Sequence, residues 1–173
     1  AKPDVVADIR GYFLQTLGVE LRVFDGGARR HNLDFFVVET TPAHKLSDIQ
    51  KLLETYLPAD QPGGAIVYCA TRSKTEEIAK FLVGMGWSAA HFHAGLSPEI
   101  KKTTQHQFIS GELRVIAATN AFGMGIDKPD VRLVLHADMP GSLENYVQEA
   151  GRAGRDQHAA TCVLLHSEQD IEQ

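Results

Sequence analysis

The residues with the clearest chemical potential are two arginines near the C-terminal end of the sequence. Arg152 and Arg155 lie three residues apart within Tyr146–Asp156, so a helical turn would place them on one side. Arginine suits a phosphate clamp, because its planar and permanently charged guanidinium can donate two parallel hydrogen bonds to one anion. The glycines beside each arginine would leave room for a bulky anion. The alternative is that Glu149 and Asp156 pair with both arginines in surface salt bridges, worth about 0–1 kcal/mol each.

Three other segments place polar residues or glycines directly after an apolar run. They are Ala70–Ser73, His93–Ser97 and the end of Val115–Asp127. The start of a helix binds phosphate through its free amides, and glycine allows a backbone to approach a ligand closely. For Ala70–Ser73, a simple helix cap is an equally good interpretation. The candidate ligand contacts in these segments are Thr71, Arg72, Gly95, Thr119, Gly123, Gly125 and Asp127.

Two common parts of a nucleotide site are missing from the sequence. No Gly-Lys dipeptide occurs, so the chain has no phosphate loop of the G-x-x-x-x-G-K-[ST] type. No Asp-Glu dipeptide occurs that could hold magnesium and a catalytic water. Arginines suited to a γ-phosphate without these parts indicate half of a nucleotide site, with the other half supplied from elsewhere.

Metal binding is not expected from this sequence. Cys69 and Cys162 each lie in an apolar run, which predicts buried thiols in a reducing compartment. The chain has no C-x-x-C pair. His91 and His93 could share one face of a strand, but two histidines without a third ligand more often pack or form hydrogen bonds.

Composition limits the class of protein. The 173 residues are 43% hydrophobic and 23% charged, which is typical of one globular domain and excludes a collagen or a disulfide scaffold. The net charge of −5 does not exclude local phosphate-binding patches, although Arg29-Arg30, Arg72 with Lys74, and Lys101-Lys102 are each also typical of solvated surface. No apolar run of membrane length and no secretory signal occurs, so we expect neither a membrane nor a secreted protein. Because the sequence does not begin with Met, we expect a processed chain or an excised part of a longer one.

The elements that must position these residues alternate between strands and helices. Residues 46–57 have helical spacing, Ser73–Glu76 has the pattern of a capping box, and Ser97-Pro98 is typical of a helix start that would end at Gly111. Short apolar runs predict strands at 35–38, 65–69, 89–92, 115–118, 133–136 and 161–165, and a last helical stretch covers 145–148. This alternation predicts an α/β fold with a parallel sheet flanked by helices on both faces. Such sheets bind ligands at the carboxyl ends of their strands.

Taken together, the motifs resemble the second RecA-like domain of superfamily 2 helicases, most closely the RecQ family of DNA helicases. The stretch from Ile66 to Leu82 resembles motif IV, Ala118–Arg132 resembles motif V, and Tyr146–Asp156 resembles motif VI. Gln148-Glu149 stand where RNA helicases of the DEAD-box type usually have His-Arg. Residues 30–33 are similar to the Arg-Pro-Asn-Leu linker of the family, although His31 replaces its proline.

The resemblance implies roles for the nucleotide-site candidates. Arg155 resembles the arginine finger that reaches the γ-phosphate across an interdomain cleft, with Arg152 and Gln148 beside it. Asp127, with Gly123 and Gly125 before it, resembles the acidic end of motif V near the nucleotide. ATP and Mg²⁺ would be held mainly by the first RecA-like domain of the same parent chain, and this chain alone would be inactive.

The resemblance also implies a nucleic-acid surface and a domain organisation. Thr71, Arg72, Gly95 and Thr119 would grip the backbone of single-stranded or unwinding DNA, although Gly141 replaces an arginine often found in the family. Residues 1–30 would be the tail of the preceding motor domain and a linker, and 31–173 the second RecA-like domain. DNA repair or recombination in a bacterial cytosol or a nucleus would follow. The alternatives are a stand-alone RecA-like nucleic-acid-binding module and an RNA-directed helicase domain.

Overall fold

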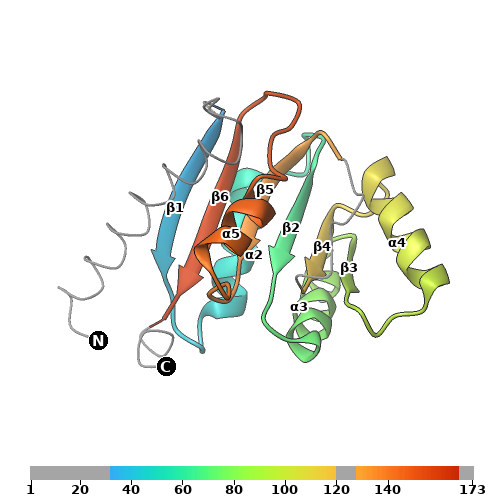
Figure 1. Ribbon diagram of the computed structural model, residues 1–173, viewed down its shortest axis with the longest axis horizontal. Coiled ribbons are helices and arrows are strands. Elements are labelled where there is room, and N and C mark those ends of the chain that lie inside the picture. Colours follow the sequence, from blue (N-terminus) through green and yellow to red (C-terminus); the bar gives the residue numbers. More distant parts are fainter. Residues whose placement is uncertain (1–31, 120–127, 168–173) are drawn as a thin grey trace.

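The predicted parallel sheet is present in the computed structural model, which describes residues 32–119 and 128–167. Within these residues the sheet has six parallel strands in the order β1-β6-β5-β2-β4-β3 (Figure 1). The strands are β1 (Leu33–Glu39), β2 (Gly64–Tyr68), β3 (Ala89–Phe92), β4 (Val115–Ala118), β5 (Val131–His136) and β6 (Ala160–His166). The helices are α2 (Lys45–Tyr56), α3 (Arg72–Gly84), α4 (Pro98–Ser110) and α5 (Leu143–Ala150). None of these helices combines the length and apolarity needed to cross a membrane.

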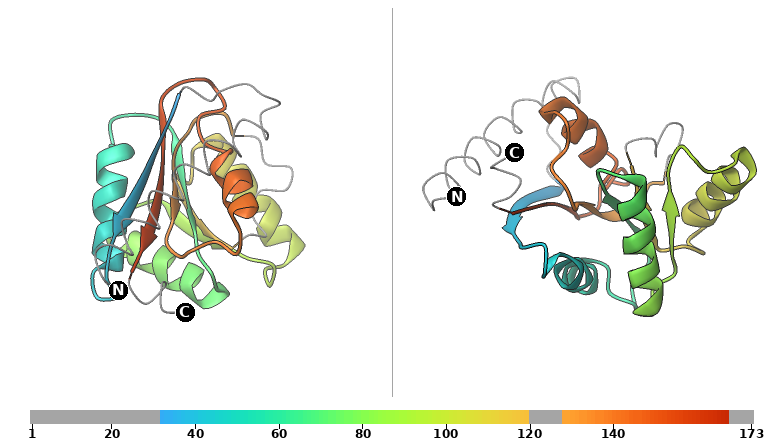
Figure 2. Two further views of the ribbon diagram at one scale, coloured as in Figure 1. Left: turned by 60° about the vertical axis from the view of Figure 1, so that its left-hand side comes forward. Right: turned by 90° about the horizontal axis from the view of Figure 1, so that it is seen from below.

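Helices cover both faces of the sheet, as the alternation predicts (Figure 2). On β2, Ala65 and Val67 pack with the buried side chains of α2 and α3, while Ile66 and Tyr68 pack with those of α4 and α5. Because all five residues of β2 are buried, this strand is a continuous apolar run in the sequence. The two cysteines predicted to be buried are buried and form no disulfide with each other, and burial raises the pKa of Cys69 to about 12.

One helix start differs from the prediction. Ser73 does not cap α3, because the helix begins at Arg72 and the side chain of Thr71 accepts a hydrogen bond from the Lys74 amide at 3.2 Å. The extended backbone of Thr71, with φ −132° and ψ 156°, is that of an N-cap residue. The start and end of α4 are as predicted: Ser97 caps it, Pro98 opens it, and Gly111 follows it with φ 89°.

The sheet separates the candidate residues into two groups at opposite ends of its strands (Figure 1). Thr71, Gly95 and Thr119 follow β2, β3 and β4, so they lie at the carboxyl ends, where ligand contacts are expected. The segment 151–159, which contains both arginines, instead leads into the amino end of β6. The general rule for parallel sheets therefore accounts for one group of candidates and not for the other.

Candidate nucleotide and nucleic-acid sites

The segment 151–159, called here the arginine loop, has a backbone fixed against the sheet. The amide of Gly154 donates to the carbonyl of Val131 at 2.9 Å, and the amide of Asp156 donates to the carbonyl of Pro129 at 3.0 Å. Arg155 lies between these two anchored residues. Its peptide position is therefore set by the start of β5, while its side chain is exposed.

Gly154 is needed for the backbone conformation of the arginine loop and does not make space for an anion. Its φ of 58° lies in the left-handed region, which side chains other than glycine rarely adopt. A Cβ there would lie 2.5 Å from Nδ2 of Asn32 and 3.0 Å from the Cβ of Ala160. The interpretation that this glycine leaves room for a bulky anion is wrong, because protein atoms already fill the space beside it.

The acidic residues next to the arginines have other partners. The Glu149 carboxylate lies 2.9 Å from Nε2 of His136, and Asp156 accepts a hydrogen bond from Arg132 at 2.5 Å. The carboxylate of Asp156 also accepts the amide of His158 at 3.0 Å, and these bonds lower its pKa although its slight burial acts to raise it. Both acids thus shape the loop and its neighbourhood.

The two arginine side chains converge with a lysine. One small cavity is lined by Arg152, Arg155 and Lys128, together with Ile66, Phe108 and Val131. The Nε atom of Arg152 is buried there and has no hydrogen-bond partner among the described residues. A buried donor without a partner is uncommon, and an anion or a water would satisfy it. This cavity of about 10 Å³ has room for about one water, and Lys128 is paired with Asp130 at 2.9 Å. A phosphate would therefore have to meet the arginines from outside the cavity, where the side chain of Arg155 is exposed.

Aromatic residues pack against one another inside the protein, and one of them, Tyr68, lies beside Arg152. The ring of His136 stacks on Tyr68 at 5.0 Å and contacts Tyr146 at 4.6 Å. Burial raises the pKa of Tyr68 far above its usual value of 10, although the charge of Arg152 beside it acts in the opposite direction. The phenol therefore stays protonated and neutral next to the guanidinium. The sequence does not predict this packing of Tyr68 and His136, nor the place of Lys128 in the lining of the cavity.

The remaining candidates of the nucleotide site are only partly described. Gln148 lies on α5 with an exposed side chain, on the opposite side from the buried residues of that helix. Gly123, Gly125 and Asp127 lie outside the described residues. Their predicted contacts with a nucleotide therefore stay predictions.

The carboxyl ends of β2, β3 and β4 bring together all four predicted nucleic-acid contacts, here called the carboxyl edge: Thr71, Arg72, Gly95 and Thr119. The Thr119 amide donates to the carbonyl of Phe92 at 3.3 Å, which joins the ends of β4 and β3. A Cβ on Gly95 would lie 3.1 Å from a terminal nitrogen of Arg72, so that guanidinium lies directly over the glycine. Arg72 and Gly95 are both exposed.

Asp138 fixes the chain at one side of the carboxyl edge. Its carboxylate accepts the Ala70 amide at 2.8 Å, the Lys74 ammonium at 2.9 Å and the Lys45 ammonium at 3.0 Å. Burial acts to raise the pKa of Asp138, but these three hydrogen bonds outweigh it and lower the pKa below 3.8. Lys74 is therefore engaged within the protein, whereas Arg72 projects from the surface.

A comparison with known protein families assigns the chain to one of them. Residues 44–157 match the family described as "Helicase conserved C-terminal domain". The chain belongs to this family.

Curated relatives of the helicase C-terminal domain are RecQ-type DNA helicases, which confirms the resemblance seen in the motifs. The domain is 41% identical to a putative ATP-dependent DNA helicase Q1 of Caenorhabditis briggsae, over 99% of this chain and 27% of the relative. It is 43% identical to the ATP-dependent DNA helicase RecQ of Bacillus subtilis, over 84% and 24%. With the RecQ-like DNA helicase BLM of Xenopus laevis it shares 38% identity, over 99% and 12%. The chain thus spans 12–27% of the length of these relatives.

Solved structures confirm the RecA-like fold of the helicase C-terminal domain. A chain of the crystal structure of the E. coli DEAD-box protein SrmB bound to RraA superposes with a TM-score of 0.69 at 24% identity, over 83% of this chain and 81% of that chain. A DEAD box protein from Methanococcus jannaschii gives a TM-score of 0.73 at 23% identity, over 84% of this chain and 39% of that one. At this level of identity the likeness concerns the fold alone.

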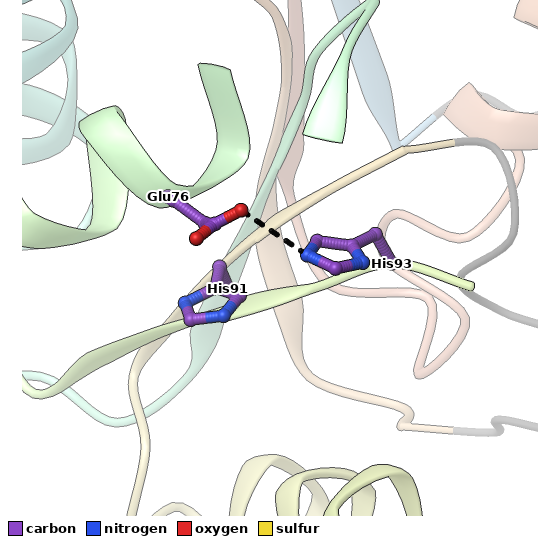
Figure 3. Close-up of side chains that lie close together, drawn as sticks. All are labelled: Glu76, His91 and His93. Atoms are coloured by element: carbon purple, nitrogen blue, oxygen red, sulfur yellow. Dashed lines mark ion pairs between the residues drawn. The ribbon is translucent and has the colours of Figure 1, made fainter. Parts of the chain in front are cut away.

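A third polar cluster of the helicase C-terminal domain lies beside the carboxyl edge. Figure 3 shows Glu76 of α3 with His91 of β3 and His93, which directly follows β3; their ligand-type atoms all lie within 4.8 Å of one another. Nδ1 of His93 accepts the Gly95 amide at 3.1 Å, so a neutral ring carries its proton on Nε2, which faces Glu76 at 3.4 Å. This pairing orients the Gly95 turn without an ion. Glu76 could not be recognised as part of this cluster from the sequence, because it lies 15 residues before His91 on another element.

Proposed function

We propose that this chain is the second motor domain of an ATP-dependent DNA helicase of the RecQ type. The observation that carries the proposal is the arginine loop, whose anchored backbone presents an exposed Arg155 three residues after Arg152. The family match and the RecQ-type relatives support the same assignment. Residues 1–30 would then connect this domain to a preceding one that contributes the rest of the nucleotide site.

The residues near the arginine loop fit the phosphate end of ATP but not its magnesium. Arg155 and Arg152 would donate hydrogen bonds to the γ-phosphate, and their positive charge would stabilise the negative charge that develops during transfer. Asp130 and Asp156 are paired with Lys128 and Arg132, which leaves neither of these carboxylates available for a cation. Mg²⁺, which neutralises phosphate charge when it is bound, would therefore be held by the other motor domain.

The carboxyl edge supplies the proposed contacts with DNA. The starts of α3 and α4 offer amides, Thr119 offers a hydroxyl, and Arg72 offers a permanent charge, all of which suit phosphate oxygens. Such contacts hold the nucleic-acid backbone without reading its sequence. Because both groups are built on one sheet, closure of the interdomain cleft at the arginine loop would also shift the DNA-holding edge relative to the other motor domain. A cytoplasmic or nuclear location follows from this role.

Substitution of Arg155 in the full-length parent protein tests the proposal. Arg155→Ala should lower the rate of DNA-stimulated ATP hydrolysis by about 10³–10⁵-fold, which is the range known for arginine fingers. Lys51→Ala serves as the control, since it removes a positive charge at an exposed position of α2 and should leave hydrolysis nearly intact. A loss below about tenfold for a folded Arg155→Ala protein, as judged by its melting curve, would refute the assignment.

The chain by itself provides a second arm of the same experiment. We expect the 173 residues to hydrolyse no ATP, with or without single-stranded DNA, and to contribute to turnover only together with the preceding domain. Clear DNA-stimulated turnover by the isolated chain would mean that it contains a complete nucleotide site. The two-domain proposal would then be wrong even if Arg155 proved essential.

A further inference from the structure

Asn32, the first described residue, connects the beginning of β1 to the arginine loop. Its side-chain Nδ2 donates one hydrogen bond to the carbonyl of Gly154 at 2.7 Å and another to the carbonyl of His158 at 2.9 Å. Its own carbonyl accepts the amide of Ala160 at 3.0 Å. One asparagine therefore holds two points of the arginine loop and the first residue of β6, all more than 120 residues further along the chain.

The bond to Gly154 acts directly on Arg155. The carbonyl of Gly154 belongs to the peptide group that joins it to Arg155, and the same oxygen also accepts the amide of Gln157 at 3.0 Å. The Asn32 amide thus fixes the orientation of the peptide from which the arginine side chain projects. The side chain of Asn32 also packs closely against Gly154, since a Cβ added to that glycine would lie only 2.5 Å from Nδ2.

The contact of Asn32 with the arginine loop requires the NH₂ group of its side-chain amide. Both bonds come from Nδ2, whereas the buried Oδ1 atom has no hydrogen-bond partner among the described residues. Aspartate has nearly the same shape but no donor, and it would direct a carboxylate oxygen at two carbonyl oxygens. Alanine would remove the contact altogether. The position therefore distinguishes asparagine from residues of similar size.

Asn32 lies at the point where the chain enters the sheet. It directly precedes β1, which pairs with β6 from Leu33 and Ala160 onward (Figure 1). The sequence predicts that residues 1–30 lead from a preceding motor domain. We propose that Asn32 is a positioning residue for Arg155, and that it couples the entry of the linker into β1 to the orientation of the arginine. This inference rests on the proposed role of Arg155 in ATP hydrolysis.

A double-mutant cycle in the full-length parent protein tests the coupling. Asn32→Asp should lower kcat for DNA-stimulated ATP hydrolysis by about 10- to 100-fold while KM for ATP changes by less than about threefold, because the finger acts mainly in the transition state. In the Arg155→Ala background the same substitution should change kcat by less than about threefold, since the group it positions is gone. Asn32→Ala should repeat this pattern and covers the case in which the aspartate variant does not fold. Asp34→Ala, at an exposed position of the same strand, is the control and should leave kcat unchanged in both backgrounds.

The outcomes separate the inference from the proposal on which it rests. Equal losses in the two backgrounds would show a general structural role for Asn32 and would overturn the coupling. No loss from either Asn32 variant, when Arg155→Ala is strongly impaired, would overturn the inference and leave the proposed function standing. A loss below about tenfold from Arg155→Ala itself would overturn both.

Discussion

The two ends of the sheet position their functional residues in different ways. At the amino end, the arginine loop is held by backbone hydrogen bonds to Pro129 and Val131 and by the side chain of Asn32, so that a turn without helical structure keeps one shape. At the carboxyl edge, helices begin directly after the strands, and caps such as Thr71 and Ser97 define the path of the chain. The first arrangement fixes the direction of a charged side chain. The second exposes amides along a surface, which suits contact with a repeating phosphate backbone.

The largest loss of stability is expected from a substitution of Gly154, in the arginine loop at the amino end of the sheet. Gly154→Ala adds a Cβ at positive φ and forces Asn32 away from both carbonyls, so we expect a loss of about 3 kcal/mol in the free energy of unfolding. Urea denaturation of the chain measures this loss. Gly111→Ala is the matched control, because Gly111 also has positive φ but has open space around it, and it should lose only about 1 kcal/mol. Similar losses at the two glycines would mean that the contact with Asn32 contributes little to the arginine loop.

A smaller effect is expected at Asp138, which fixes the carboxyl edge. Asp138→Asn removes a charge that two lysines and one amide share, and it should cost about 2 kcal/mol of unfolding free energy at neutral pH. Because folding lowers the pKa of this carboxyl, its stabilising contribution is complete above the unfolded value near 3.8 and is lost as the pH falls through the lower folded value.

Urea titrations at several pH values check both parts of this prediction. The difference between the wild-type protein and Asp138→Asn should be constant at neutral pH and should shrink below about pH 4. Asp60→Asn, at an exposed position, is the control and should alter stability by less than about 0.5 kcal/mol. A difference that stays constant down to pH 2 would contradict the assigned role of the charge.

Arg72→Ala should weaken the binding of single-stranded DNA by the full-length protein about threefold to tenfold. Loss of one phosphate contact should also lower the slope of log K against log salt by about 0.7–1. Fluorescence anisotropy at several salt concentrations measures both quantities. Lys51→Ala removes a positive charge from an exposed position of α2 and should change neither. An unchanged salt slope for Arg72→Ala would place the DNA contact elsewhere.

The sequence predicts most of the elements because the strands are buried. The runs at 65–69, 115–118 and 161–165 differ from the observed strands by at most one residue at each end, since both faces of these strands contact helices. The sequence does not predict the strand order, because pairing between β1 and β6 joins residues about 127 positions apart. The arginine loop lies at the amino end of the sheet because it connects α5 to β6, and in a parallel sheet every helix-to-strand connection lies at that end.

The candidate residues could be predicted from the sequence where the neighbouring residues mark the end of a strand or the start of a helix. Thr71, Arg72, Gly95 and Thr119 were predicted from their places after apolar runs, and the structure brings them together. Asn32 joins the arginine loop through hydrogen bonds between distant segments, and no local pattern predicts such contacts. The wrong cap of α3 has a similar cause. Asp138 accepts the Ala70 amide from 68 residues away, and this contact accompanies an extended chain up to Thr71.

The smallest predicted effect distinguishes the two candidate caps of α3. Thr71→Ala should cost about 1 kcal/mol in the free energy of unfolding, because the Lys74 amide loses its partner at the start of the helix. Ser73→Ala should change the free energy by less than about 0.5 kcal/mol, since Ser73 lies inside the first turn with an exposed side chain. Urea denaturation of both variants is the measurement. A larger loss for Ser73→Ala would mean that the helix starts at the capping-box pattern, and Arg72 would then leave the helix and its place over Gly95. The DNA contact proposed for Arg72 depends on that start, so this small difference in stability also tests how the carboxyl edge is built.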